Sequence, residues 1–150
     1  MSRDIRYIGM DIHKEAIVIR AARLIALMQT PHRFRSKRQL WTYSGLGIET
    51  HDSAQFRFVR GQLQRSKKPQ QLRGLNRNHN HEMKEIFKST ATRASCGIGP
   101  FHEFYAALLA KGMKPEMARL TLARKIAAIT LTLWKKGERF DAEQLKTQAA

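Results

Sequence analysis

A run of apolar residues at helical spacing near the C-terminus constrains the fold more strongly than any other feature of the sequence. Pro115 suits the first turn of a helix, and Gly137 can end one. The residues expected on the buried face between them are Met117, Leu120, Ala123, Ile126, Ala127, Thr130, Leu133 and Trp134. A helix with one apolar face needs other elements to cover that face. The pattern therefore predicts a mainly helical domain.

Shorter helical patterns precede this one, each with its own start or stop signals. They cover residues 21–28, the stretch from Ser36 to Gly45, and residues 78–92 and 101–111. Pro31 stops the first pattern, and Ser36 can cap the second by accepting a hydrogen bond from the first turn. The last residues, 138–150, are polar and are expected to fray.

Two stretches have the patterns typical of strands instead. The apolar runs 7–10 and 16–19 flank a short basic turn, which predicts a β-hairpin that lifts Asp11 out of an apolar strand. The helical pattern begins directly after Ile19, although compact domains normally use about two to six residues to connect a strand to a helix. Residues 54–64 alternate, which predicts a short strand-like or loop segment. The expected fold is mainly α with a short N-terminal β-hairpin.

The charge of the chain indicates a polyanionic partner. It has 28 lysines and arginines against 12 acids, a net charge of +16, for which nucleic acid is the commonest partner. Between Asp52 and Glu82 there is no acid, and Phe56 and Phe58 interleave with arginines. The cations expected to contact nucleic acid lie in this window and in a basic cluster before it: Arg33, Arg35, Lys37, Arg38, Arg57, Arg60, Arg65, Lys67, Lys68, Arg73 and Arg77. A solvated basic loop is the alternative, and the long acid-free window favours nucleic acid.

Histidine, cysteine and serine side chains could also carry chemistry. On a helix His79 and His81 would point about 200° apart, so a structural or phosphate-contacting role is favoured over a shared metal ion. Cys96 has no neighbouring cysteine, and a buried thiol is expected. Ser53 has a histidine two residues before it and an acid beside it, which permits a nucleophile. Its spacing alone favours a turn or cap residue.

A cytoplasmic location is expected from three features of the sequence. A single cysteine cannot form an internal disulfide, which fits a reducing compartment. The N-terminal residues lack the pattern of a signal peptide. The longest apolar region, Ile126 to Trp134, is too short to cross a bilayer, so no membrane partner is expected.

Three stretches resemble one group of bacterial insertion-sequence transposases, which includes the Piv-like invertases. Residues 7–15, YIGMDIHKE, resemble the first strand of the group's RuvC-like DEDD domain. Residues 20–55, from RAARLIALM to ETHDSAQ, resemble the start of its C-terminal transposase domain. Residues 115–137, PEMARLTLARKIAAITLTLWKKG, resemble its closing helix. The C-terminal part of the resemblance covers about residues 20–137 and is the more specific.

The resemblance implies an enzyme that cuts and rejoins DNA. In this family four acids of the RuvC-like domain bind a divalent metal, normally Mg²⁺, and a serine attacks the DNA phosphate to form a covalent link. Matched residue by residue, Asp11 falls on the first metal-binding acid and Ser53 on the catalytic serine. Some members use a structured guide RNA, and the family acts in multimers. The resemblance therefore adds a guide RNA, a homo-oligomer or an intact transposase to DNA as expected partners.

The chain also departs from the family pattern. The other three acids should lie in a long stretch after the hairpin, but the sequence passes from Ile19 directly into the second domain. We interpret the chain as an internally deleted transposase. Its expected parts are a remnant hairpin of a largely missing RuvC-like domain (1–19), a DNA-binding and serine-bearing C-terminal transposase domain (20–137) and a polar tail (138–150).

The loss of three acids bears on catalysis. One carboxylate cannot organise a two-metal site, and a serine needs a base or a metal to activate it. The chain alone is therefore expected to bind no Mg²⁺ and to be catalytically defective. Three hypotheses stay open: a transposase completed by an intact partner chain, a basic module that holds DNA or RNA without cutting, and a translated remnant without a selected function.

Overall fold

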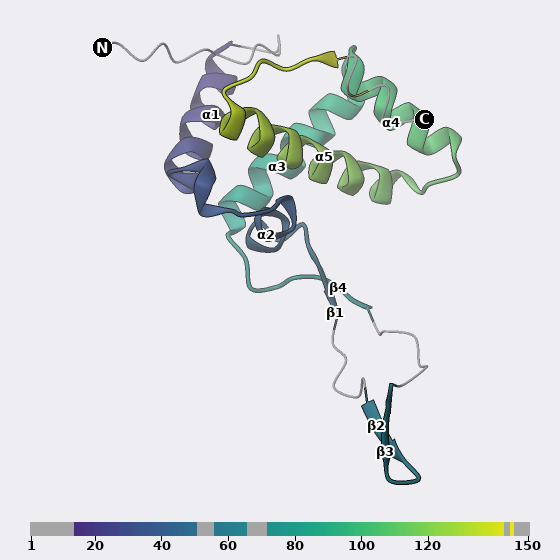
Figure 1. The fold of residues 1–150 in the computed structure, drawn as a ribbon. Helices are drawn as coiled ribbons and strands as arrows, with labels where there is room; N and C mark the ends of the chain where they lie inside the picture. Colours follow the sequence, from purple (N-terminus) through teal and green to yellow (C-terminus); the bar gives the residue numbers. More distant parts are fainter. Residues whose placement is uncertain (1–13, 51–55, 66–71, 143–144, 146–150) are drawn as a thin grey trace.

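The computed structural model describes residues 14–50, 56–65, 72–142 and 145. Within them the chain forms five α-helices, one short 3-10 helix and four short strands. In chain order they are α1 (Lys14–Met28), η1 (Pro31–Arg33), α2 (Lys37–Tyr43), β1 (Ile48–Thr50), β2 (Phe56–Val59), β3 (Gln62–Arg65), β4 (Leu72–Leu75), α3 (His81–Cys96), α4 (Pro100–Ala110) and α5 (Pro115–Lys136). Figure 1 shows the helices gathered in one body, with the strands extending from one side of it. The expected mainly helical class is confirmed.

The helices begin and end at residues suited to those positions. The side chain of Ser36 accepts a hydrogen bond from the backbone N–H of Gln39 at the start of α2, as the sequence predicted. Asn80 caps α3 in the same way by accepting from the N–H of Met83 at 2.9 Å. Gly137 ends α5 with φ +67°, a left-handed conformation that glycine adopts without strain. Local capping therefore sets the start of α2 and both ends of α5 where the sequence indicated, whereas α3 spans His81–Cys96 in place of the expected 78–92.

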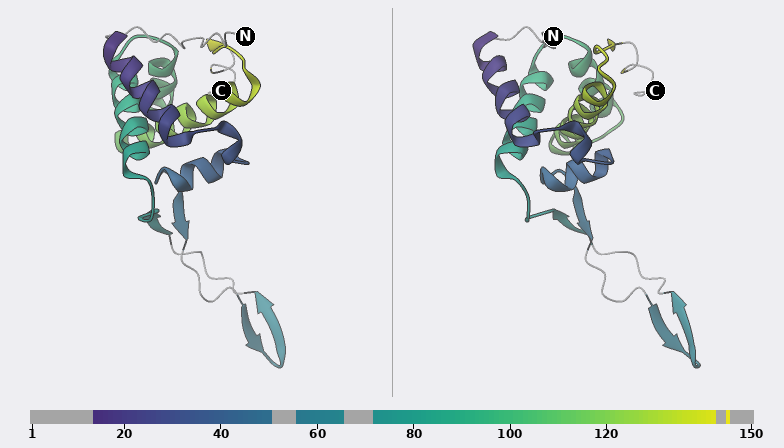
Figure 2. Two further views of the ribbon diagram at one scale, coloured as in Figure 1. Left: turned by 90° about the vertical axis from the view of Figure 1, so that its left-hand side faces the viewer. Right: turned by 60° about the vertical axis from the view of Figure 1, so that its left-hand side comes forward.

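Helix α5 lies at the centre of the helical body and packs against α2, α3 and α4. Figure 2 shows α1 and α3 side by side along one flank of this body. The largest fully buried hydrophobic side chains of the shared core are Phe87, Met28, Leu40, Leu46, Met83 and Leu122. They come from α1, α2, the segment after α2, α3 and α5, so one core joins segments far apart in the sequence.

The buried face of α5 differs in part from the expected one. Ala123, Ile126 and Ala127 are buried as expected, but Met117 is 48% exposed. Ala118, Leu122 and Leu131 are buried although the single apolar stripe did not include them. Since α5 contacts three other helices, it buries more than one stripe of its surface, and the assumption of a single face was wrong.

The prediction of a second strand in the N-terminal hairpin was wrong. Residues 16–19 belong to α1, which continues without interruption past Arg20. Isoleucine and valine favour strands, but the same helix buries Met28 in the core, and this tertiary packing outweighs the local preference. The abrupt strand-to-helix junction at Ile19 therefore does not exist. The first expected strand, with Asp11, lies outside the described residues.

The strands form two antiparallel pairs, β1 with β4 and β2 with β3. The described part of the strand-like or loop segment expected over 54–64 forms the β2–β3 hairpin, whereas this pairing, β1 and its pairing with β4 were not predicted. Arg60 and Gly61 join β2 to β3 with φ of +52° and +77°. Positive φ at both turn residues is typical of the tight turns that match the twist of a hairpin. Figures 1 and 2 show this hairpin standing away from the helices.

The segment after α5 contributes to the core. The ring of Phe140 stacks on that of Phe101, with centroids 5.2 Å apart, and Leu145 is 2% exposed. The expected polar tail, 138–150, thus returns at least one apolar side chain to the helical body. None of the helices in the described residues is long and apolar enough to cross a membrane.

Candidate nucleic-acid interface

Two cations of the predicted set are held against aromatic rings of α2 and the segment before it. The guanidinium of Arg33 lies 4.6 Å from the centre of the Tyr43 ring and 5.7 Å from that of Phe34. The ammonium of Lys37 lies 5.8 Å from the centre of the Trp41 ring. These cation–π contacts keep the charges at the surface and limit their freedom. Arg33 and Lys37 are therefore presented in defined positions.

Helix α5 brings further cations to the same region. The ammonium of Lys135 donates hydrogen bonds to the backbone oxygens of Phe34 at 2.6 Å and Arg35 at 3.3 Å. Lys125 lies close enough to Lys37 for the two charges to interact, and its pKa falls below the usual value because of burial first and Lys37 second. Two segments about 100 residues apart thus share one positively charged region.

We name this region the α2–α5 basic face. It comprises Arg33 and Lys37, their exposed sequence neighbours Arg35 and Arg38, and Lys125 and Lys135 of α5. The sequence predicted the first four but missed Lys125 and Lys135. The sequence shows only that these two lysines lie on an amphipathic helix. It does not show that this helix packs against α2.

Hydrogen bonds beneath the basic face fix α2 on α5. The indole N–H of Trp41 donates to the backbone oxygen of Arg124 at 3.0 Å. The Nε–H of Arg124 donates to the backbone oxygen of Leu46 at 2.7 Å. Burial lowers the pKa of the Arg124 guanidinium, and its Nη2 atom is buried without a hydrogen-bond partner. Arg124 therefore holds α5 to the segment after α2 and does not present its charge on the basic face.

The other predicted contacts lie along the strands and the segment after them. Arg60 is exposed at the β2–β3 turn, and Arg77 is exposed between β4 and α3. Arg57, Arg65 and Arg73 belong to β2, β3 and β4 respectively. Lys67 and Lys68 lie outside the described residues. The predicted set is thus divided between the helical body and the strands.

The two predicted catalytic residues are not among the described residues. Ser53 falls in the chain between the end of β1 at Thr50 and the start of β2 at Phe56, and Asp11 precedes α1. Both assignments stay predictions of the resemblance.

No donor set for a metal ion is present in the part of the chain that the structure describes, because no three histidine, cysteine, aspartate or glutamate side chains gather there. The described residues therefore do not fit the Mg²⁺ that the transposase resemblance implies. We derive no step through a metal.

The two histidines at the start of α3, His79 and His81, lie closer together than expected. Their ring centres are 4.4 Å apart, because α3 begins at His81 and only the extended cap residue Asn80 separates the two. The assumption that both lie on the helix was wrong. The ammonium of Lys84 lies 3.3 Å from Nε2 of His79, and a positive charge there opposes a metal ion. A structural role fits His79, whose ring packs against Gly45.

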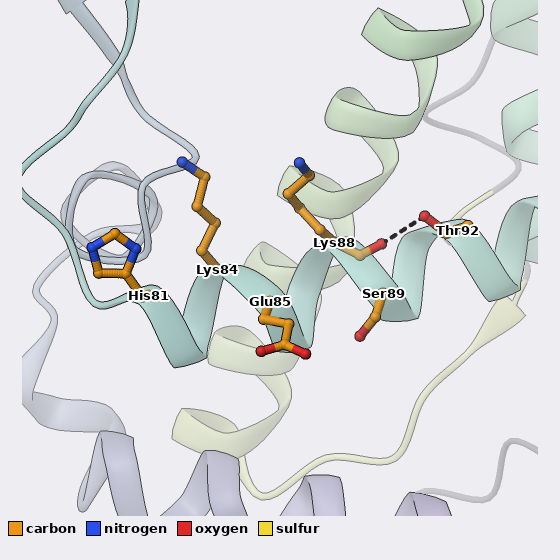
Figure 3. Close-up of a pocket in the computed structure, with 6 residues that line it drawn as sticks. All are labelled: His81, Lys84, Glu85, Lys88, Ser89 and Thr92. Carbon is orange, nitrogen blue, oxygen red and sulfur yellow. Dashed lines mark hydrogen bonds between the residues drawn. The ribbon is translucent and has the colours of Figure 1, made fainter.

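An open depression of about 380 Å³ runs along one side of α3. Figure 3 shows its lining residues, His81, Lys84, Glu85, Lys88, Ser89 and Thr92, projecting from this one helix. Arg20 of α1 donates to the hydroxyl of Ser89 at 3.1 Å at its edge. Since a single helix forms the lining and its charges are mixed, the depression offers no enclosed site.

Cys96, at the end of α3, is exposed, so the expected burial of its thiol was wrong.

Comparison with known proteins bears on this surface. Residues 18–75 match the sequence model of the family described as Transposase IS116/IS110/IS902 family. The matched segment contains α2, all four strands and the predicted cations from Arg33 to Arg73. The match covers less than half of the chain and makes this segment similar to insertion-sequence transposases. No curated protein and no solved structure matches the chain.

Proposed function

We propose that the chain is a transposase-derived DNA-binding protein of a mobile insertion sequence, and that the α2–α5 basic face holds duplex DNA. The family match over residues 18–75 supports the transposase origin. The basic face carries the proposal for DNA binding. Three of its cations, Arg33, Lys37 and Lys135, come from two distant segments and are held by contacts to rings and carbonyls, which a merely solvated charge run lacks.

The electrostatics of the face favour a polyanion. The pKa of Lys125 is lowered by its burial first and by the nearby charge of Lys37 second. Like charges held close together raise the free energy of the isolated protein, and a row of phosphates relieves this repulsion while releasing counterions. A polyanion is therefore the kind of partner whose charge complements this face.

The finer proposal concerns ancestry and activity. We place the chain in the RuvC-like DEDD, Piv-like group, with an internal deletion that removed most of the metal-binding domain. The resemblance of residues 7–15 and 20–55 supports this. The chain alone then binds DNA without cutting it, and Ser53 acts only where an intact transposase supplies the missing acids and their Mg²⁺.

A salt titration tests DNA binding by the basic face. Duplex binding is measured by fluorescence anisotropy for the wild type and for the triple variant Arg35→Gln, Lys37→Gln, Arg38→Gln. Each phosphate contact contributes about 0.9 to the slope of log K against log salt, so the variant should lose about 2 to 3 units of slope. The control is Arg93→Gln, Lys114→Gln, Arg119→Gln, which removes the same charge from exposed positions elsewhere. Equal losses in both variants contradict the proposal and indicate binding by net charge alone.

A further inference from the structure

The β2–β3 hairpin exposes apolar side chains that the rest of the chain would bury. Phe58 is 76% exposed, Leu63 60% and Phe56 55%. In the helical body, by contrast, Phe34, Phe87, Phe101 and Phe104 are all buried. The two exposed phenylalanines are the chain's most exposed aromatic side chains among the described residues.

The pairing register places these side chains on one face. Phe58 is directly opposite Leu63, so both point to the same side of the hairpin, and Phe56, two residues before Phe58, shares that side. Arg60 and Gly61 close the hairpin through a tight two-residue turn, which fixes the register. The result is a small flat apolar face carrying two rings.

Among the described residues, no helix covers this face (Figures 1 and 2). A two-stranded hairpin is marginally stable by itself in water, so a partner that covers the rings would also stabilise the hairpin. The face is thus suited to an occupant that comes from outside the described chain.

The charge around the hairpin indicates the chemistry of that occupant. No acid occurs between Asp52 and Glu82, and Arg60 is exposed at the tip of the hairpin. A second copy of the chain, also at +16, would be repelled. A polyanion with flat apolar surfaces meets both requirements. Unpaired nucleotides offer base faces for stacking next to phosphates, whereas the bases of a duplex are already stacked on one another.

We propose that the face formed by Phe56, Phe58 and Leu63 binds the unpaired bases of a DNA strand by stacking. This inference rests on the proposed function and deepens it. The α2–α5 basic face holds the duplex, and the hairpin takes bases that have left it. The two surfaces therefore recognise different forms of the same partner.

Single-strand binding by ring variants tests the inference. Affinity for a fluorescent oligothymidine is measured by anisotropy at one salt concentration. Phe58→Leu keeps an apolar side chain but removes the ring, and should weaken binding about 5- to 100-fold, the usual loss for one stacked base. Phe58→Tyr keeps the ring and should restore binding to within about threefold. The control Val59→Thr changes the other face of the same strand and should leave affinity unchanged.

Each outcome separates this inference from the proposed function. Duplex binding that is lost in the basic-face variant but kept in Phe58→Leu, together with weakened single-strand binding in Phe58→Leu, supports both. Normal single-strand binding by Phe58→Leu overturns the hairpin inference alone. Failure of the wild type to bind any DNA overturns both. Tighter binding of an oligouridine than of oligothymidine overturns the assignment to DNA, and a dimer in sedimentation that Phe58→Leu abolishes overturns it in favour of self-association.

Discussion

The ammonium of Lys135 lies 2.6 Å from the backbone oxygen of Phe34, although 101 positions separate the two residues in the chain. This hydrogen bond ties the C-terminal end of α5 to the segment just before α2. The same lysine therefore contributes both to the stability of the fold and to the charge of the α2–α5 basic face. A substitution at this position should be felt in both properties.

Replacing Lys135 with methionine keeps the apolar stem and removes the donor. We expect a loss of about 1.5 kcal/mol in the free energy of unfolding, because a part-buried carbonyl loses a charged donor. Urea denaturation followed by circular dichroism measures this loss. Lys136→Met is the matched control, since its pairing with Glu138 is exposed and contributes about 0–1 kcal/mol. Equal losses for the two variants would contradict a specific role for Lys135.

Gly45→Ala should destabilise the protein by about 2–3 kcal/mol. Gly45 has φ +67°, and an added Cβ would lie 2.5 Å from Cγ of His79. The control Gly112→Ala, with φ +82° and open space around it, carries only the backbone strain of about 1–2 kcal/mol. Thermal melts compare the two, and His79→Ala in the Gly45→Ala background should recover part of the difference. No recovery would mean that His79 is not the cause.

The pH dependence of stability should report the pair Lys125 and Lys37. A lysine whose pKa is lowered in the folded state releases its proton more readily there than in the unfolded chain. Below its pKa in the folded protein, the charged Lys125 lowers the free energy of unfolding by its full amount. This loss of stability is relieved as the pH rises from that pKa towards the usual value of 10.5. The free energy of unfolding should therefore rise at alkaline pH as Lys125 loses its proton. The rise should be smaller in Lys37→Gln, because this substitution removes a nearby charge and so raises the pKa of Lys125.

The measurement compares each protein with its Lys125→Met counterpart by urea unfolding at about pH 7 and about pH 10. The difference between the two pH values isolates the titration of this one ammonium. Arg38→Gln, which removes an exposed charge from the same helix, serves as the matched background. An alkaline gain of equal size in the wild-type and Lys37→Gln backgrounds would contradict the coupling.

A covalent link to DNA tests the catalytic proposal. We expect no protein–DNA adduct from this chain alone in Mg²⁺, because only Asp11 of the four acids implied by the resemblance matches. Labelled DNA on a denaturing gel detects such a link. Ser53→Ala is compared with Ser66→Ala, which removes a hydroxyl from the same basic window. An adduct formed by the wild type and by Ser66→Ala, but absent in Ser53→Ala, would show that the chain is active by itself.

The helices were predictable because their signals are local. Ser36, Pro115 and Gly137 each favour a helix boundary by conformation or capping, and these preferences hold whatever surrounds them. The strand predicted for residues 16–19 failed for the opposite reason. Strand preference is a weak local tendency, and it lost to a helix anchored in the core through Met28.

The candidate site was only partly predictable for the same physical reason. Arg33 and Lys37 stand out in the sequence as part of a basic cluster, whereas Lys125 and Lys135 look like ordinary solvent-facing positions of α5. They join the site only because α2 docks on α5. The exposure of Phe58 was equally hidden, since strand alternation predicts a shared face but not whether another element covers it.

The uninterrupted course of α1 across Arg20 has a geometric consequence. Each residue of a helix adds a rotation of about 100° about the axis and a rise of about 1.5 Å along it. Inserting one residue between Lys14 and Arg20 would turn the first turns of α1 by about 100° relative to α3, while the contact between Arg20 and Ser89 stayed in place. The length of α1 before Arg20 would thus determine the orientation of any domain fused to its N-terminal end, in steps of one residue.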